Sequence, residues 1–424
     1  MIFFLVSITG LICYLVYRNA TLQDITFKNR PIEPTGSRDA FGRERVSEPF
    51  TLGDYKLIYG DNSDFLQKIT GSGATLVNRT DKAAVRLSVT ESDTGSIIHQ
   101  TRKYHHYMPG KSQLIFASFV LYEKASGVTK KIGYFDDEGG IYLQQNPEGI
   151  LSLNIKDPEG KVNSISKNNW DTDIDIDVSK TQLMFIDFQW LGVGRIRFGF
   201  VSKDEYIICH TVYNSNLRDE VFMSSPNLPI RFEISSVSQN TGGYIDQICS
   251  TVISEGGYSE SGREWSYGTQ TAKSVASGAT EAILSIRLTN TYNGYKNRMT
   301  VEMKDIDILS EDDNIYYELR KIDQSSDISS NWTDIETDES GVSYSDTTNV
   351  SVVSGSVIST GYVTGGNRKG ATGGLGSDEP TNTKQNYITQ NYDSTDSQAY
   401  LLVCKNIGSS STNVYGSLSW KEIY

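Results

Sequence analysis

Two clusters of carboxylates are the residues of this sequence whose types and spacing most resemble a catalytic or cation-binding site. The first is Asp136–Asp137–Glu138, which is followed by Gly139–Gly140. A glycosidase needs two carboxylates that face each other across the scissile bond, whereas neighbours in one turn do not oppose one another. We therefore interpret this cluster as a solvated hairpin turn, with a calcium site or a catalytic site as the alternatives.

Acids alternate along the second cluster, "DTDIDID", which begins at Asp171. On an extended segment, residues two apart project from the same face. Close carboxylates repel one another unless solvent or a cation screens them. The pattern predicts either a loose Ca²⁺ or Mg²⁺ site or a wet strand edge that discourages aggregation, formed by Asp171, Asp173, Asp175 and Asp177. No other cofactor is expected.

Nucleophiles and metal ligands in recognisable spacing are scarce. The four histidines are His99, His105, His106 and His210, and the adjacent pair would point in opposite directions on a strand. Neither G-x-S-x-G, nor a Walker A sequence, nor a dinucleotide fingerprint occurs. The cysteines stand singly, so we expect free thiols, with a Cys209–Cys249 disulfide left open. We expect no enzymatic activity.

Aromatic side chains in a Gly/Ser-rich region could instead stack on sugars or form the rim of a protein contact. The candidates are Tyr258, Trp265, Tyr267, Tyr292 and Tyr295. The partners expected from them are a host glycan or a neighbouring protein, including a second copy of the chain. A formal net charge of −13 argues against nucleic acid as a partner.

Short β-branched and aromatic runs must position these residues. Segments such as "SQLIFASFVLYEK", "TQLMFIDFQWL" and "PIRFEISSV" follow one another, separated by Gly, Asp, Asn or Pro clusters. In "LMFIDFQW", Met184, Ile186 and Phe188 share the face that must meet a core. Many strands without intervening helices predict an all-β chain with a large antiparallel β-sandwich or jelly-roll-like domain.

Composition divides the chain into four parts. We expect a transmembrane anchor over 1–18, an extended linker and docking arm over 19–54, a large sandwich over 55–322 and a small C-terminal β-domain over 323–424. The last boundary rests on a polar, acidic stretch that begins near residue 323.

The N-terminal 17 residues carry no charged side chain, and Arg18 ends the run. This length is near the lower limit for a membrane-spanning helix, with a cleaved signal peptide as the alternative. Lys and Arg follow the span, which predicts that the bulk of the chain faces the cytoplasmic side of the membrane.

The segment "SRDAFGRERVSEPFTLGDYK", at 37–56, resembles a signature of large virion structural proteins from aquatic tailed phages and from giant or algal viruses. The likeness continues in order through "HQTRKYHHYMPGKSQLIFASF", "KKIGYFDDEGGIYLQQ" and "NGYKNRMTVEM", covering roughly residues 37–305. The resemblance implies a virion component and assigns no catalytic or ligand residues.

Within that signature, arginines and aromatic residues suit a docking arm, because guanidinium groups bind carboxylates and rings fill pockets. The arm residues are Arg38, Phe41, Arg43, Arg45 and Phe50. The arm contacts either its own sandwich or a neighbouring chain. We expect a viral structural protein, a minor capsid or other virion component, that packs against capsid neighbours and is tethered to a membrane. The alternatives are a host-attachment fibre or spike that binds glycans and, in a third class, a virion-borne glycan hydrolase.

Overall fold

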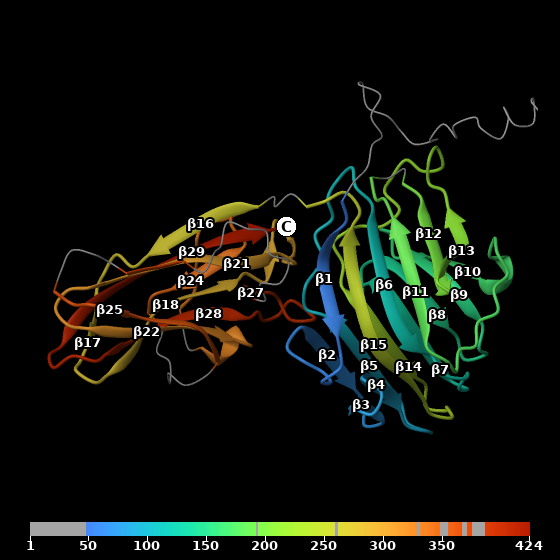
Figure 1. Ribbon diagram of the computed structural model, residues 1–424, viewed down its shortest axis with the longest axis horizontal. Helices are drawn as coiled ribbons and strands as arrows, with labels where there is room; N and C mark the ends of the chain where they lie inside the picture. Colours follow the sequence, from blue (N-terminus) through green and yellow to red (C-terminus); the bar gives the residue numbers. More distant parts are fainter. Residues whose placement is uncertain are drawn as a thin grey trace, which may run out of the picture. The chain divides into compact units, whose positions relative to one another are not determined.

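The computed structural model describes residues 48–191, 194–258, 262–328, 331–347, 355–366, 371–374 and 386–424. Its strands form four large antiparallel sheets and one short hairpin. Strands β1 to β15 build two of the sheets, and strands β16 to β29 build the others (Figure 1). We call these two halves the first sandwich, Phe50–Ser254, and the second sandwich, Arg263–Ile423.

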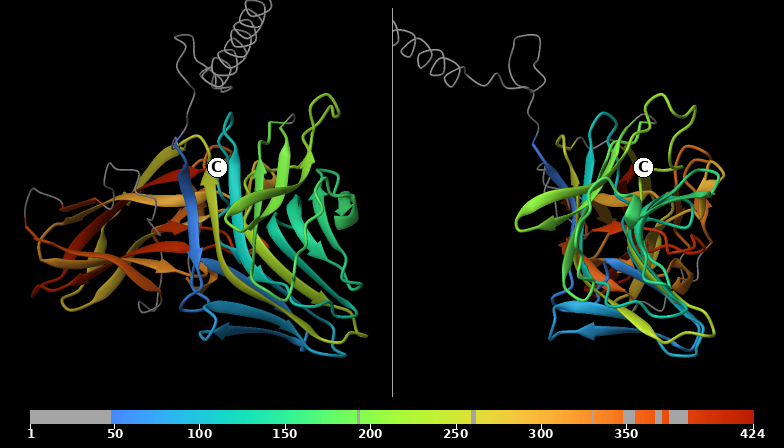
Figure 2. Two further views of the ribbon diagram at one scale, coloured as in Figure 1. Left: turned by 45° about the vertical axis from the view of Figure 1, so that its right-hand side comes forward. Right: turned by 90° about the vertical axis from the view of Figure 1, so that its right-hand side faces the viewer.

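The first sandwich pairs an eight-stranded sheet with a seven-stranded sheet, whose layers can be followed in Figure 2. The eight-stranded sheet has the order β13 (Glu205–Val212), β12 (Ile196–Ser202), β11 (Gln182–Phe188), β6 (Gln113–Val120), β15 (Gly243–Ser254), β4 (Ala84–Val89) and β3 (Ala74–Arg79), with β1 (Phe50–Lys56) on β15. The seven-stranded sheet has the order β10 (Val162–Ser166), β9 (Leu151–Lys156), β8 (Gly140–Gln145), β7 (Val128–Phe135), β14 (Ile230–Ser236), β5 (Gly95–Thr101) and β2 (Phe65–Thr70).

The second sandwich is built in the same way from two six-stranded sheets. One has the order β16 (Arg263–Gly268), β29 (Thr412–Ile423), β21 (Thr300–Ser310) and β26 (Ala371–Gly374), with β17 (Lys273–Val275) on β29 and β27 (Tyr387–Ile388) on β21. The other has the order β23 (Thr333–Asp334), β24 (Val342–Ser345), β18 (Thr280–Leu288), β28 (Ala399–Asn406), β22 (Ile315–Ile322) and β25 (Ser356–Val363). The hairpin is β19 (Thr291–Tyr292) with β20 (Tyr295–Lys296).

Alternation of apolar and polar residues explains why these segments pair as they do. Met184, Ile186 and Phe188 of β11 point into the first core and are fully buried, as the period-two pattern predicted. The core of the first sandwich extends from Leu52 to Val252, and a separate core from Val275 to Trp420 fills the second. Each sandwich therefore has a hydrophobic interior of its own.

The structure does not support the predicted transmembrane helix. Residues 1–18 lie outside the described residues, and the helical segments among the described residues are two three-residue 3₁₀ turns, Lys167–Asn169 and Ser325–Asp327. No helix in this described part of the chain is long and apolar enough to cross a bilayer. The all-β character agrees with the structure, whereas the membrane anchor and the cytoplasmic-facing membrane location inferred from it are not supported.

The predicted boundary at 322 falls inside the second sandwich. Strands β18 and β22, which precede it, share a sheet with β24 and β28, which follow it. The acidic stretch after residue 322 thus contributes strands to an existing sheet. The two sandwiches meet in the sequence between Ser254 and Arg263.

Candidate ligand-binding face of the first sandwich

A row of polar side chains crosses the seven-stranded sheet on the side away from the core. Gly133 of β7 is in register with both Tyr142 of β8 and Arg231 of β14, and Arg231 is in register with Gln100 of β5. Their strand neighbours, such as Ile132 and Phe232, point into the core instead. We call this row the polar face, and it comprises Gln100, Lys131, Tyr142, Gln144, Ser152, Asn154, Arg231 and Glu233. Lys131, Gln144 and Glu233 are partly exposed, and the other five are buried.

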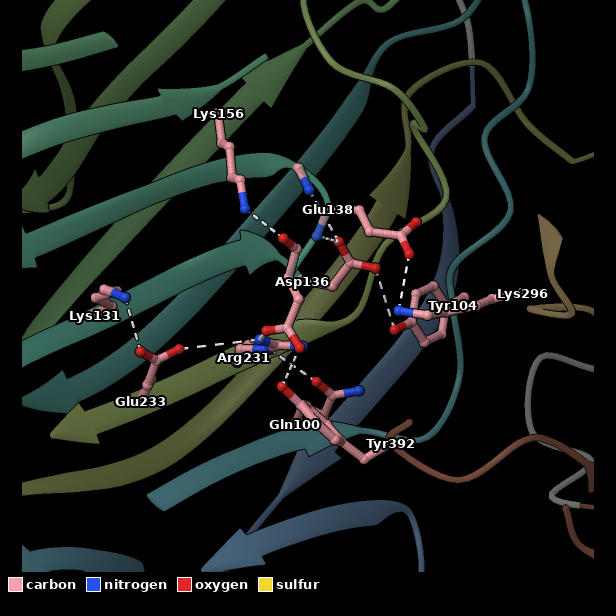
Figure 3. A network of polar contacts seen from close by, with 12 residues as sticks. Gln100, Tyr104, Lys131, Asp136, Glu138, Lys156, Arg231, Glu233, Lys296 and Tyr392 are labelled. Carbon is pink, nitrogen blue, oxygen red and sulfur yellow. Dashed lines mark hydrogen bonds and ion pairs between the residues drawn. The ribbon is translucent and has the colours of Figure 1, made fainter. Parts of the chain in front are cut away.

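Arg231 is the centre of the polar face (Figure 3). Its side chain is only 2% exposed. The Nε atom donates to Gln100 Oε1 at 2.8 Å, and Nη1 lies 2.7 Å from Asp137 Oδ1 and 4.0 Å from Glu233 Oε2. A buried guanidinium is tolerated only when carboxylates compensate its charge. Arg231 is therefore held in one orientation by partners from three separate elements.

Asp137 comes from the turn between β7 and β8. In that turn Asp136 Oδ1 accepts hydrogen bonds from the backbone N–H groups of Glu138 at 2.8 Å and Gly139 at 3.1 Å. The acidic cluster is a hairpin turn, as predicted, and Asp136 closes it. This closure leaves Asp137 free to point at the polar face, where its side chain remains 56% exposed.

The remaining charges of the face are also arranged in pairs. Lys131 donates to Glu233 at 2.8 Å, so that two neighbouring strands each contribute one charge. Tyr142 lies beside them, with its ring centroid 4.6 Å from that of Phe135 and 5.8 Å from Lys131 Nζ. Burial and the Glu233 charge raise the pKa of Tyr142 to about 12, so its hydroxyl stays protonated at neutral pH.

The electrostatic surroundings of Asp137 favour its ionised form. Partial burial by itself would raise the pKa of Asp137, but hydrogen bonds from Tyr392 and Arg231 and the Arg231 charge lower it on balance. A general acid for glycoside cleavage needs a raised carboxyl pKa. The arrangement thus offers fixed donors and acceptors, which suit hydrogen bonding to hydroxyl groups better than proton transfer.

The loop after β27 adds an aromatic ring to the edge of this face. The Tyr392 hydroxyl donates to Asp137, and the Arg231 guanidinium lies 5.2 Å from the ring centroid (Figure 3). Lys68 Nζ of β2 lies 4.5 Å from the same centroid. Cations over an aromatic ring are attracted by its quadrupole, so both cations favour this position of the Tyr392 ring.

The predicted cation site is not assembled among the described residues. Asp171 Oδ2 accepts from the Thr211 N–H at 2.8 Å, and Asp177 Oδ1 accepts from the Ser179 N–H at 3.0 Å. Asp173 and Asp175 are exposed between them, and the segment is not paired in a sheet. Within the described ranges, no group of three or more His, Cys, Asp or Glu side chains could hold a metal ion.

The docking arm lies almost wholly outside the described residues. Arg38, Phe41, Arg43 and Arg45 fall there, and only Phe50 is described, at the start of β1. Its ring stacks on Tyr258, with centroids 4.6 Å apart. These two predicted residues therefore contact each other at the edge of the first core.

The other aromatic candidates do not form one cluster. Trp265 and Tyr267 of β16 pack against the second core, and Tyr267 stacks on Tyr344 with centroids 3.6 Å apart. Tyr292 packs against the same core, whereas Tyr295 is 78% exposed. Cys209, Cys249 and Cys404 are free thiols.

Sequence reasoning did not identify Arg231 or Glu233. The signal was present in "PIRFEI", where Arg231 and Glu233 alternate with core residues and must share the outer face. Their partners lie on other strands and loops, which the local pattern does not show.

Comparisons with known proteins found no matching family model and no matching curated protein. Solved structures with some likeness include the CBM2 module of the evolved Dit of Lactobacillus casei BL23 phage J-1, at 9% identity and a TM-score of 0.34, covering 51% of this chain and 100% of that one. A second is a β-1,3-glucanase from Mycobacterium marinum, at 12% identity and a TM-score of 0.33, covering 47% of this chain and 97% of that one. A third is the Emp47p carbohydrate recognition domain, at 12% identity and a TM-score of 0.32, covering 52% of this chain and 100% of that one. TM-scores this low carry no argument about function.

Proposed function

We propose that this protein is a non-enzymatic structural component of a virion, and that its first sandwich binds carbohydrate through the polar face. The observation that supports binding is Arg231, a buried cation fixed between Asp137, Glu233 and Gln100 on the side of the sheet away from the core. A fixed network of this kind binds ligands without having to order its own side chains first.

The chemistry of the polar face matches that of a sugar. Each hydroxyl group of a pyranose both donates and accepts, so recognition needs acceptors and donors side by side. Asp137 and Glu233 supply acceptors, whereas the partly exposed Lys131 supplies a donor. Tyr392 offers a ring at the edge of the face for the apolar side of a sugar.

The virion role is supported by the ordered sequence blocks that begin at residue 37. Two sandwiches, each with its own core, would supply the mechanical scaffold that such a component needs. We propose packing against capsid neighbours as the structural part of this role, with host attachment through the bound glycan as its functional part.

The carbohydrate proposal is tested on the full chain with an array of neutral and anionic oligosaccharides, followed by calorimetry with the oligosaccharides bound. Asp137→Asn removes a charged acceptor and should weaken binding roughly 10- to 100-fold, since one charge-assisted hydrogen bond contributes about 1.5–3 kcal/mol. Asp81→Asn is the matched control, because Asp81 is likewise paired with an arginine and similarly exposed, at 61%. Equal binding by both variants, or no binding by the parent chain, contradicts the proposal.

The virion proposal is tested separately by mass spectrometry of purified particles. We expect peptides of the first and the second sandwich in constant ratio to the major capsid protein across a density gradient. Recovery of the chain only in the soluble fraction of infected cells would rule out a structural role.

A further inference from the structure

The second sandwich carries an aromatic and charged surface of its own on the sheet that contains β22 and β25. Tyr316 of β22 is directly opposite Tyr362 of β25, and their ring centroids are 5.3 Å apart with planes at 50°. Tyr362 is 71% exposed and lies on a strand that pairs on one side only among the described residues. The edge position of β25 thus leaves the ring of Tyr362 open to a ligand from solvent.

Two charged residues continue the row along β22. Glu318 Oε1 accepts from the Tyr316 hydroxyl at 3.0 Å, and Glu318 Oε2 accepts from Arg320 Nε at 2.6 Å. Residues 316, 318 and 320 share one face because they are two apart, while Ile315 and Leu319 point into the second core. The ring pair, the carboxylate and the guanidinium are thus linked and oriented before any ligand arrives.

The Glu318–Arg320 pair also limits what this surface can bind. The carboxylate already occupies donors of the guanidinium, so the site presents no unpaired arginine for an acidic group. The chain as a whole carries a net charge of −13, which repels polyanions. Exposed rings beside a paired acid and base suit the apolar face and the hydroxyl groups of an uncharged sugar.

We propose that Tyr316, Glu318, Arg320 and Tyr362 form a second carbohydrate site, on the second sandwich, for a neutral hexopyranose polysaccharide. Tyr362 stacks on one sugar ring while Glu318 and Arg320 hydrogen-bond to its hydroxyl groups. This site is independent of the polar face, because it is built entirely from strands of the second sandwich. Two weak sites on one chain would raise the apparent affinity for a long polymer when both are engaged.

The test is native affinity electrophoresis of the full chain in gels that contain laminarin, mannan or galactan, with alginate as the polyanion. Tyr362→Ala should reduce retardation by a neutral polysaccharide, corresponding to about a tenfold weaker affinity, and Tyr362→Trp should restore it. Tyr59→Ala is the control, since Tyr59 is also an exposed tyrosine, at 94%, in the first sandwich. Circular dichroism checks that each variant is folded.

Combination with Asp137→Asn separates the two sites. If both exist, each single variant is retarded less than the parent chain and the double variant least. Retardation unchanged by Tyr362→Ala in both backgrounds overturns the second site while leaving the first intact. If Tyr362→Ala reduces the retardation and Asp137→Asn does not, the first site is overturned instead. Absence of retardation in every neutral gel, or retardation only by alginate, also overturns the second site.

Discussion

At the scale of single residues, His105 shows how burial fixes a protonation state. The ring is fully buried, its Nδ1 donates to the Leu228 carbonyl at 3.1 Å, and its Nε2 accepts from the Tyr55 hydroxyl at 2.9 Å. The carbonyl can only accept, so the neutral tautomer with a proton on Nδ1 satisfies both bonds. Burial and, to a lesser extent, the Lys103 charge lower the pKa of His105 to about 3.

This lowered pKa predicts a pH-dependent stability. The unfolded chain binds a proton at His105 below about pH 6.5, whereas the folded chain does so only near pH 3, so stability falls as the pH drops through this window. The free energy of unfolding should fall by about 2 kcal/mol between pH 7 and pH 5 from this group. His105→Gln should flatten the profile measured by urea denaturation.

Tyr55→Phe is the matched control for this prediction. It removes the hydrogen bond to Nε2 but keeps a buried imidazole, so it should lower stability at every pH and retain the slope. A profile for His105→Gln as steep as that of the parent chain would show that other groups cause the acid sensitivity.

At the scale of elements, the position of a strand in its sheet decides how much a side chain contributes to the free energy of unfolding. Trp420 of β29 and Trp265 of β16 face each other in register. Strand β29 has neighbours on both sides, whereas β16 is at the edge of the sheet. Trp420 is completely buried, and its indole N–H donates to Glu422 Oε1 at 3.1 Å, while Trp265 is only partly buried.

The paired tryptophans predict unequal losses of stability. Trp420→Ala should cost about 3–5 kcal/mol, because it leaves a large cavity in the core. Trp265→Ala should cost about 1–2 kcal/mol, since it removes less buried area at an edge strand. Urea denaturation followed by fluorescence measures both, and equal losses would mean that β16 is as well packed as β29.

At the scale of the whole molecule, each sandwich has a large hydrophobic core of its own, and a smaller third cluster includes Leu401 and Val403 of β28. Contacts between the two sandwiches include the hydrogen bond of Tyr392 to Asp137 and the ion pair of Lys296 with Glu138 at 2.9 Å. Polar contacts at exposed positions contribute little free energy, so they couple the unfolding of two cores weakly.

We therefore expect two calorimetric transitions, one for each sandwich. Phe232→Ala removes a fully buried ring from the first core and should lower one transition by roughly 10 °C. Leu418→Ala does the same in the second core and should lower the other transition. A single transition that both substitutions shift equally would show that the sandwiches unfold as one cooperative unit.

Much of the fold could be predicted because alternation is a local property. The β11 segment showed its core face directly, and "DDEGG" showed its turn, since both depend on residues within a few positions of one another. The domain boundary predicted at residue 322 was wrong, because β24, which follows the acidic stretch, pairs with β18, far away in the sequence. A local composition change does not show such a pairing. The membrane helix rested on hydropathy alone.

Only part of the candidate site could be predicted from the sequence, for the same reason. The turn composition predicted the hairpin turn that holds Asp137, whereas the alternation in "PIRFEI", which puts Arg231 on an outer face, was not used. Their contact joins residues 94 positions apart, and Tyr392 is 255 positions from Asp137. The acids from Asp171 to Asp177 show the converse, because regular spacing suggested a common site that the backbone does not assemble.

By itself, the amino-acid sequence determined that this chain forms strands, which faces of them are apolar, and that its surface is acidic. Those properties follow from side-chain size, polarity and period, which act over a few residues. Only the tertiary structure decided how strands are shared between the two sandwiches and which charges meet at Arg231, because pairing partners and buried charges are selected by the free energy of the whole packed arrangement.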